Sequence, residues 1–539
     1  MQSLYKRLIN GALRRCEFLI NYWRITRAIQ EIDKYSNENN GTGKSVVFFN
    51  ASTRLIGVSQ NSAFSFLTAL SLKLQGVEII QFVCKSGMKK CVLGTDISNL
   101  NTAPPCRGCI RQSKTLYKGF TPYWFEFDVD NDLENALKNL TLKQLELFEY
   151  EGFPLGEVVL PSLRWILRRH HLNDYANIHQ LYREYILSAW NVRQKFVKLL
   201  SEKKPKAVIL FNGMFYPEAV AKLTAQEFNI PVYSHEVSLQ PLSAYFTDGE
   251  ATAYPIDIPD DFQLNDEQNN KLDNYLMQRF EGNFTMAGIQ FWPEIKGLGN
   301  DVEERISRYE QIVPVFTNVI FDTSQKHANV IFDHMFEWLD RVVDLIETYP
   351  ETLFIIRAHP DELRDGKASH ENVAAWVEKR NINKYENVIF INADEYISSY
   401  DLIRRAKFVM VYNSTIGLEA SIMGAAVLCA GKARFTQLPT VFYPNDRDDF
   451  VRLAKSMITS ENIDVPEMYK NNARRFLYYQ LYVSSLPFNR YLKNSQVWNG
   501  YVILKKFLWK DLLPDDSRTI KTLSHGILHD EGFLLDHET

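Results

Sequence analysis

From residue 45 onward, short apolar runs rich in β-branched residues alternate with longer amphipathic stretches. The apolar runs predict buried parallel strands, and the amphipathic stretches predict the helices that cover them. Two such series are present, separated by a polar stretch at 251–301 that contains one expected helix, Asp266–Arg279. The expected strands are 45–50, 77–83, 207–211 and 230–234 in the first series, and 313–320, 353–356, 388–391, 408–411 and 425–430 in the second.

This alternation predicts an α/β protein with two Rossmann-like domains that face a cleft. A chain of 539 residues is also too long for one ordinary domain. In the second series, Gln325–Thr348 is expected to be one long amphipathic helix. The expected parts are an N-terminal helix and linker (1–40), a first domain (41–300), a second domain (301–465), and C-terminal helices and tail (466–539). The first domain is expected to contain a helical insertion at about 130–200, and helices over 465–509 are expected to return to the first domain.

Residues 1–35 have the apolar spacing of a single helix, with basic residues such as Arg14, Arg15 and Arg24 among its polar positions. Two interpretations remain open. A basic amphipathic helix that carries aromatic residues can lie on an anionic membrane surface. Alternatively, the helix packs on the domain behind it and its basic face is solvated.

Composition and motifs exclude several classes of protein. The net charge of −4 gives no reason to expect nucleic-acid binding. No apolar run is long enough for a transmembrane helix, and the N-terminus lacks signal-peptide features, so we expect a cytoplasmic protein. If the first helix binds lipid, the protein works at the inner face of the membrane. Residues 41–45, GTGKS, are not a P-loop, because Glu38 stands where the first glycine is needed and the strand follows the loop. The absence of G-x-G-x-x-G argues against a nicotinamide or flavin oxidoreductase.

Four of the six cysteines fall within 26 residues: Cys84, Cys91, Cys106 and Cys109. The last two have the C-x2-C spacing of a metal knuckle, so a structural zinc, or another four-thiolate metal site, is one interpretation. The alternative is a set of reduced thiols without a metal.

The stretch from Phe408 to Gly431 reads FVMVYNSTIGLEASIMGAAVLCAG. It predicts a strand, a hydroxyl-rich turn, a short helix that ends at Gly424, and a further strand. The turn contains Ser414 and Thr415, whose side chains could cap the helix. Backbone N–H groups, two hydroxyls and a helix N-terminus around one point suit a phosphate.

Other polar residues also follow expected strands of the second series. Ligands bind at the carboxyl edge of an open α/β sheet, so we expect these residues to share one site. His359 could donate to a phosphate or ribose oxygen, Arg357 could neutralise a phosphate or pair with Glu362, and Glu419 could accept from ribose hydroxyls or serve only as a favourable charge at a helix N-terminus. The expected nucleotide-binding residues are Asn318, Asp322, Arg357, His359, Ser398, Ser399, Ser414, Thr415 and Glu419.

In the first domain, His235 and Glu236 come just after the expected strand 230–234. Titratable residues at that end of a parallel strand are well placed for a cleft, and Glu236, or failing that His235, is the candidate general base. A basic cluster in the helical insertion comprises Arg164, Arg168, Arg169, His170 and His171. A solvated helix face explains this cluster, although it could also receive an anionic saccharide or lipid phosphate.

The motif Arg357-Ala358-His359-Pro360, followed by Asn413-Ser414-Thr415-Ile416-Gly417 and Gly424, resembles the C-terminal domain of GT-B glycosyltransferases that make bacterial capsule and surface polysaccharide. The pairing of an HP motif with a downstream Ser-Ser/Thr motif is similar to bacterial sialyltransferases and capsular Kdo transferases, which use CMP-sugars. The resemblance implies a GT-B fold and contacts of His359, Ser414 and Thr415 with the nucleotide and its phosphate. Asn212-Gly213 with Glu236 also looks like the N-terminal domain of capsule-type transferases.

We therefore expect a metal-independent glycosyltransferase that moves a sugar from a nucleotide-activated donor to a saccharide or glycolipid acceptor. A CMP-sugar is the favoured donor, with UDP- and GDP-sugars as alternatives, and no cofactor is required for catalysis. Two other functions remain open. One is transfer of glycerol phosphate or ribitol phosphate from a CDP-alditol, since teichoic-acid CDP-glycerol phosphotransferases carry a related pair of motifs. The other is a non-catalytic binding or scaffold protein of a polysaccharide assembly complex.

Overall fold

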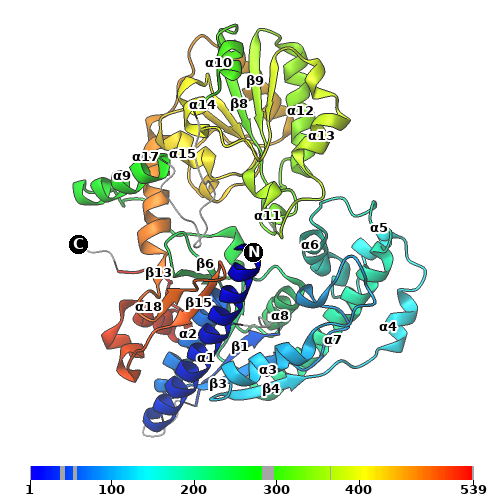
Figure 1. The fold of residues 1–539 in the computed structure, drawn as a ribbon, viewed down its shortest axis with the longest axis vertical. Coiled ribbons are helices and arrows are strands. Elements are labelled where there is room, and N and C mark those ends of the chain that lie inside the picture. The colour runs from blue at the N-terminus through cyan, green and yellow to red at the C-terminus, as the bar shows by residue number, and fades with distance from the viewer. Residues whose placement is uncertain (1, 37–42, 52–56, 282–296, 365, 537–539) are drawn as a thin grey trace.

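The computed structural model describes residues 2–36, 43–51, 57–281, 297–364 and 366–536. Two parallel sheets, each flanked by helices, form two domains (Figure 1). The expected α/β class with two Rossmann-like sheets is confirmed. Helix α17 (Glu467–Tyr478), orange in Figure 1, runs from the second domain toward the first.

The N-terminal sheet has seven strands in the order β13-β7-β6-β5-β1-β3-β4. The five consecutive strands from β6 to β4 are parallel, and β7 and β13 extend the β6 side through antiparallel pairing. Stacked rings of Phe49 and Phe82 contribute to the core on one face. The strands are β1 (Ser45–Asn50), β3 (Glu78–Cys84), β4 (Thr121–Phe125), β5 (Ala207–Phe211), β6 (Val232–Val237), β7 (Ser243–Asp248) and β13 (Leu486–Pro487).

Helices cover both faces of this sheet. Helix α2 (Gln60–Leu74) is almost entirely buried, with Ser59 as its N-cap. The helical pattern over 130–200 corresponds to α4 (Asn131–Ala136), α5 (Leu142–Glu146), α6 (Leu155–Leu167) and α7 (Ile178–Lys203). The other helices around the sheet are α3 (Cys106–Leu116) and α8 (Tyr216–Glu227).

The C-terminal sheet has five parallel strands in the order β10-β9-β8-β11-β12. The chain adds strands to one side of β8 and then crosses to the other, so the topological switch point lies between β8 and β11. The strands are β8 (Gln311–Phe316), β9 (Thr352–Arg357), β10 (Val388–Ile391), β11 (Val409–Val411) and β12 (Val427–Cys429). The helices that follow them include α13 (Val373–Lys379), α14 (Ser399–Arg405), α15 (Ile416–Ile422) and α16 (Arg447–Thr459).

Two expectations about helices were wrong. The stretch 325–348 forms two helices, α11 (Gln325–Ala328) and α12 (Met335–Thr348), because the His334 ring accepts from Glu337 N–H and caps a new helix. Only α17 and a π-turn are helical within 465–509; beyond them, β13 joins the N-terminal sheet. The short strand β15 (Tyr501–Leu504) pairs with β14 (Leu492–Asn494) on one side and with β2 (Val58–Ser59) on the other. Helix α18 (Arg518–His529) is the last helix of the described chain. The expected return of this segment to the first domain is confirmed.

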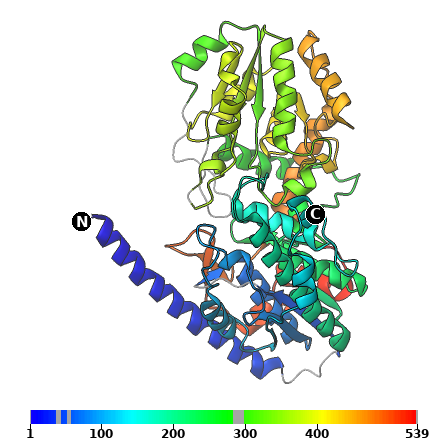
Figure 2. The same cartoon turned by 90° about the vertical axis from the view of Figure 1, so that its right-hand side faces the viewer.

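The single helix expected over residues 1–35 is observed as α1 (Gln2–Ser36). Its C-terminal half packs on the N-terminal domain, where Ile25, Ile29 and Ile32 are buried. Its N-terminal part extends beyond the body of that domain (Figure 2). Among the helices of the described residues, none combines the length and apolar character needed to cross a bilayer.

Candidate functional site

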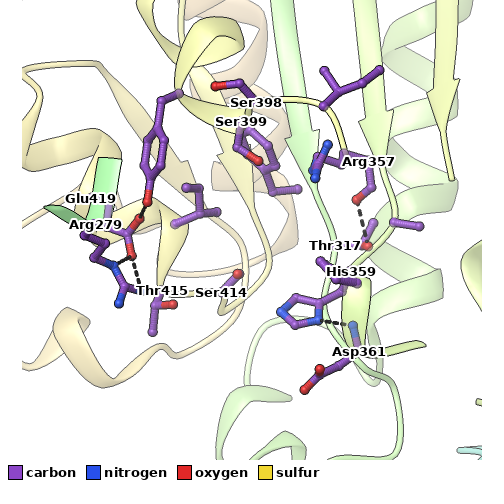
Figure 3. Close-up of a pocket in the computed structure, with 16 residues that line it drawn as sticks. Arg279, Thr317, Arg357, His359, Asp361, Ser398, Ser399, Ser414, Thr415 and Glu419 are labelled. Carbon is purple, nitrogen blue, oxygen red and sulfur yellow. Dashed lines mark hydrogen bonds and ion pairs between the residues drawn. The ribbon is translucent and has the colours of Figure 1, made fainter. Parts of the chain in front are cut away.

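A pocket opens at the carboxyl ends of β8, β9 and β11, beside the switch point of the C-terminal sheet (Figure 3). Seven of the nine expected nucleotide-binding residues line it. They are Arg357, His359, Ser398, Ser399, Ser414, Thr415 and Glu419. Residues scattered over 62 positions of sequence therefore meet because their strands end at one edge.

Ser414 and Thr415 form the turn between β11 and α15. The capping prediction was wrong, because neither side chain makes a capping hydrogen bond to α15. Both residues instead line the pocket. Gly417 lets the helix begin close to the strand, since a Cβ there would lie 2.8 Å from Cγ2 of Val411.

His359 and Arg357 follow β9 on the opposite side of β8. The His359 Nδ1 accepts from the Asp361 N–H at 3.2 Å, so the proton of the neutral ring is on Nε2. Burial lowers the His359 pKa, and the positive charge of Arg357 lowers it further, while Asp361 and Asp322 act against both effects. The ring is thus a neutral N–H donor, and Figure 3 shows it directed toward Ser414 and Thr415. Burial also lowers the Arg357 pKa, to about 10.

Glu419 is placed differently from the expectation. Its carboxylate forms an ion pair with Arg279 at 2.6 Å and accepts from the Tyr400 hydroxyl at 2.6 Å. Both oxygens are therefore engaged inside the protein, and Glu419 acts on the pocket by holding Arg279 at its wall. Sequence reasoning missed Arg279. It ends the amphipathic helix α9 (Asp266–Phe280), in a segment whose polar composition suggested only a connection between domains.

Two of the expected residues lie outside the pocket lining. Asn318 donates from its side-chain amide to Asn413 Oδ1 at 2.6 Å and thereby ties the end of β8 to the turn after β11. Asp322 lines a second hollow between the domains, together with Glu157, Arg164 and Lys326. Both residues support the edge of the sheet, and neither faces the ligand space of the pocket.

Glu236 and His235 end β6 with side chains on opposite faces of the strand. Glu236 accepts from Asn61 Nδ2 at 3.1 Å, from Asn212 Nδ2 at 3.4 Å and from the Val237 N–H at 2.8 Å. Burial raises its pKa, these hydrogen bonds lower it in part, and so does Arg434 from the second domain, leaving the Glu236 pKa above its ordinary value.

His235 is enclosed in the N-terminal domain. It is 2% exposed and stacks on Phe246, and burial lowers its pKa to about 3. Of the two candidate bases, Glu236 therefore has the higher proton affinity.

The basic cluster of the helical insertion lies at the domain contact. Glu371 of the second domain accepts from the N–H groups of His170 and His171 and from the His171 ring at 2.6 Å. With His334, the two histidines form a group whose ring nitrogens lie within 4.8 Å of one another. Arg164 stands 3.3 Å from His170 Nε2, and this guanidinium disfavours a cation between the rings. The cluster therefore acts as a polar junction between the domains.

Chemically, the pocket favours an anionic ligand. Arg357 brings positive charge, His359 supplies an N–H, and four hydroxyl-bearing residues, Ser398, Ser399, Ser414 and Thr415, stand at the N-terminal ends of α14 and α15. The Glu419 charge is neutralised by Arg279, so Asp361 is the remaining acidic side chain among the lining residues. Phosphate groups match this combination of hydrogen-bond donors and cations.

The C-terminal domain matches a family of known proteins. Residues 289–440 fit the family model described as "Capsule polysaccharide biosynthesis protein". This is well under half of the chain, but it includes all five strands of the C-terminal sheet and every pocket residue except Arg279. The C-terminal domain is thus similar to capsule polysaccharide biosynthesis proteins. No curated protein matches the chain in sequence.

Several solved structures are similar at low identity. The KpsC β-Kdo 2,4 transferase of Thermosulfurimonas dismutans is 13% identical, with a TM-score of 0.34 over 52% of this chain and 80% of that one. The KpsC β-Kdo 2,7 transferase of the same organism is 15% identical, with a TM-score of 0.32 over 58% and 86%. S. aureus MnaA, solved with UDP, is 11% identical, with a TM-score of 0.26 over 90% and 96%.

The ion pair behind the pocket gives a stability prediction. We expect Glu419→Gln to lower the free energy of unfolding by roughly 3 kcal/mol, because Arg279 would be left buried without a counter-charge. Glu303→Gln is the control; its pair with Arg405 is exposed and should contribute at most about 1 kcal/mol. Urea unfolding of both variants measures the difference, and equal losses would contradict a buried positioning role for Glu419.

Proposed function

We propose that this protein is a glycosyltransferase of capsule or surface polysaccharide synthesis. The observation that supports the proposal best is the convergence of Arg279, Arg357, His359, Ser414 and Thr415 on one pocket beside the switch point. All of the residues that line this pocket, except Arg279, lie within the region that matches the capsule biosynthesis family. In the proposal it holds the nucleotide and phosphate of an activated sugar, and a CMP-sugar is the favoured donor because of the HP and Ser-Thr motifs.

In the proposed mechanism, the acceptor approaches from the N-terminal domain. Glu236 takes the proton from the attacking hydroxyl, and its raised pKa makes it a stronger base than an ordinary glutamate. The departing phosphate gains charge as the glycosidic bond breaks. His359 Nε2–H, the hydroxyls of Ser414 and Thr415, and the Arg357 guanidinium stabilise that charge without reorganising. These donors carry the role that a divalent ion has in other transferases, so the proposed reaction is metal-independent.

The role of Glu236 gives a kinetic prediction. We expect Glu236→Gln to reduce kcat by about 10²- to 10⁴-fold while nucleotide affinity stays the same, because the amide cannot accept a proton. Nucleotide release from a CMP-sugar, in the presence of a polysaccharide or glycolipid acceptor, is the measurement. Glu227→Gln, a partly exposed carboxylate of the same domain, is the control.

The same base should set the acid limb of the pH profile. Protonated Glu236 cannot act, so kcat/KM falls as the pH drops through its pKa, which lies above the ordinary value of 4.5. Full turnover by Glu236→Gln, or an acid limb that persists unchanged in the variant's residual activity, would remove Glu236 as the base.

The His359 contact gives a binding prediction. We expect His359→Ala to weaken nucleotide binding by about 10- to 100-fold, the range for losing one hydrogen bond to a charged group. Calorimetric titration with CMP and UDP measures the change. His370→Ala removes an exposed imidazole of the same domain and should leave the affinity unaltered. Equal affinity in His359→Ala and the wild type would refute the assignment of the nucleotide to this pocket.

We further propose that α1 touches the inner face of the membrane, where a glycolipid acceptor would be met. Its protruding part carries an exposed apolar stripe, with Ile9, Leu19 and Trp23 between 41% and 62% exposed. Arg15 stands beside this stripe, and Arg27 lies over the Trp23 ring, with 5.6 Å between the guanidinium carbon and the ring centroid. Apolar side chains flanked by arginines on one helix face suit an anionic lipid surface.

Vesicle binding tests this contact. We expect the double variant Leu19→Glu/Trp23→Glu to lose most of its co-sedimentation with vesicles that contain anionic lipid, because two charges would enter the apolar layer. Val129→Glu introduces a charge at a 63% exposed site outside α1 and is the control. Unchanged sedimentation of the double variant, or no sedimentation of the wild type, would rule the contact out.

A further inference from the structure

Four cysteines of the N-terminal domain line one small apolar pocket. Cys84 ends β3, Cys91 lies in the following loop, and Cys106 and Cys109 stand in the first turn of α3. The rest of the lining is mostly apolar and includes Ala51, Met88, Pro104 and Pro105. Chain segments 25 residues apart are thus arranged so that four sulfur atoms share one dry space.

Backbone N–H groups lie close to two of these cysteines. The Gly87 N–H donates to Cys84 Sγ at 3.2 Å. The Gly94 N–H donates to the Cys91 carbonyl oxygen at 3.0 Å, and the backbone groups of Gly94 and Leu93 act to lower the Cys91 pKa. Each of these cysteines begins a Cys-x-x-Gly turn, and hydrogen bonds of this kind stabilise a thiolate that is bound to a metal.

Packing against the turns leaves no room for a side chain at either glycine. A Cβ at Gly87 would lie 2.2 Å from the Phe125 ring, and a Cβ at Gly94 would lie 2.6 Å from Pro104 and 3.2 Å from Cys91 Sγ. Ser86 adopts a left-handed backbone, with φ of 58°, and so turns the Gly87 N–H toward Cys84. The local backbone is therefore shaped around the two sulfurs.

A bound metal cation compensates the charge of several thiolates at once, and each thiol releases its proton on binding. Four thiols that line one apolar pocket are therefore suited to a metal centre.

We propose that Cys84, Cys91, Cys106 and Cys109 bind a thiophilic metal centre, either an iron–sulfur cluster or a zinc ion. Thiolates in an apolar, water-poor pocket are the ligands that both centres prefer. The centre joins the end of β3, the loop at 85–105 and the start of α3. It lies at the carboxyl edge of the N-terminal sheet, with β1 and β5 between it and the strand that carries Glu236.

The spacing of the sulfurs bears on which centre is bound. A single zinc with Zn–S bonds of 2.3 Å would hold its sulfurs about 3.8 Å apart. Within the described chain, the histidine cluster is the one group of three potential ligand atoms that lie within 4.8 Å of one another. The cysteine sulfurs are therefore spread more widely than one zinc ion requires, and a polynuclear cluster fits that spread with less movement.

Metal analysis of the whole chain tests the proposal. Protein is purified without oxygen from cells supplied with iron and zinc, and metals and acid-labile sulfide are measured. We expect about one zinc per chain, or about four irons with sulfide and a broad visible absorption. The double variant Cys106→Ser/Cys109→Ser should lose the metal, while Cys16→Ser, which alters an exposed cysteine of α1, should keep it.

A second measurement does not depend on how the variant folds. Wild-type protein stripped of metal is titrated with Co²⁺, which gives intense thiolate charge-transfer bands when several cysteines bind it. Only trace metal in the wild type together with no such bands would overturn the proposal, as would equal metal in the double variant. CMP and UDP titrations on the same samples keep this test separate from the function of the C-terminal pocket.

Discussion

All parallel strands of a doubly wound sheet end at the same edge, and the site depends on this constraint. The C-terminal sheet reverses its winding between β8 and β11, so the connections after these strands diverge and leave space between them. Residues from the ends of β8, β9 and β11 are thereby held around that space. Their positions are fixed by buried strands such as β9, whose six residues are all buried.

Buried ion pairs and hydrogen bonds fix the charged residues that the sheet topology alone does not position. Arg279 comes from outside the sheet, and its buried pair with Glu419 fixes it at the pocket wall. Because Glu419 neutralises Arg279, the groups that remain for a ligand are Arg357, His359 and the hydroxyls of the β11–α15 turn. In the other domain, two asparagines and a backbone N–H hold Glu236, while burial keeps its proton affinity high. Glu236 and the pocket that favours an anion thus lie on different domains.

Much of this arrangement could be predicted from the sequence. The short apolar runs predicted the positions of nearly all the parallel strands, because a buried strand has a recognisable local pattern. The ends of these predicted strands then identified seven of the pocket residues, because ligands bind at the carboxyl edge of such a sheet. Contacts between residues that are far apart in the sequence could not be predicted in this way. The Arg279–Glu419 pair joins residues 140 positions apart, and His334 divides a stretch that is amphipathic throughout. The strands after α17 are two to four residues long and carry no periodic signal of their own.

The most direct test of the account is a crystal structure of the full chain with bound CMP or UDP. We predict that the nucleotide phosphate lies at the switch point, with an oxygen within hydrogen-bond distance of His359 Nε2 and of the Ser414 or Thr415 hydroxyl. The nucleotide should leave the side facing Glu236 open for an acceptor. A nucleotide bound in the N-terminal domain, or one whose phosphate makes no contact with His359 or the β11–α15 turn, would contradict the account.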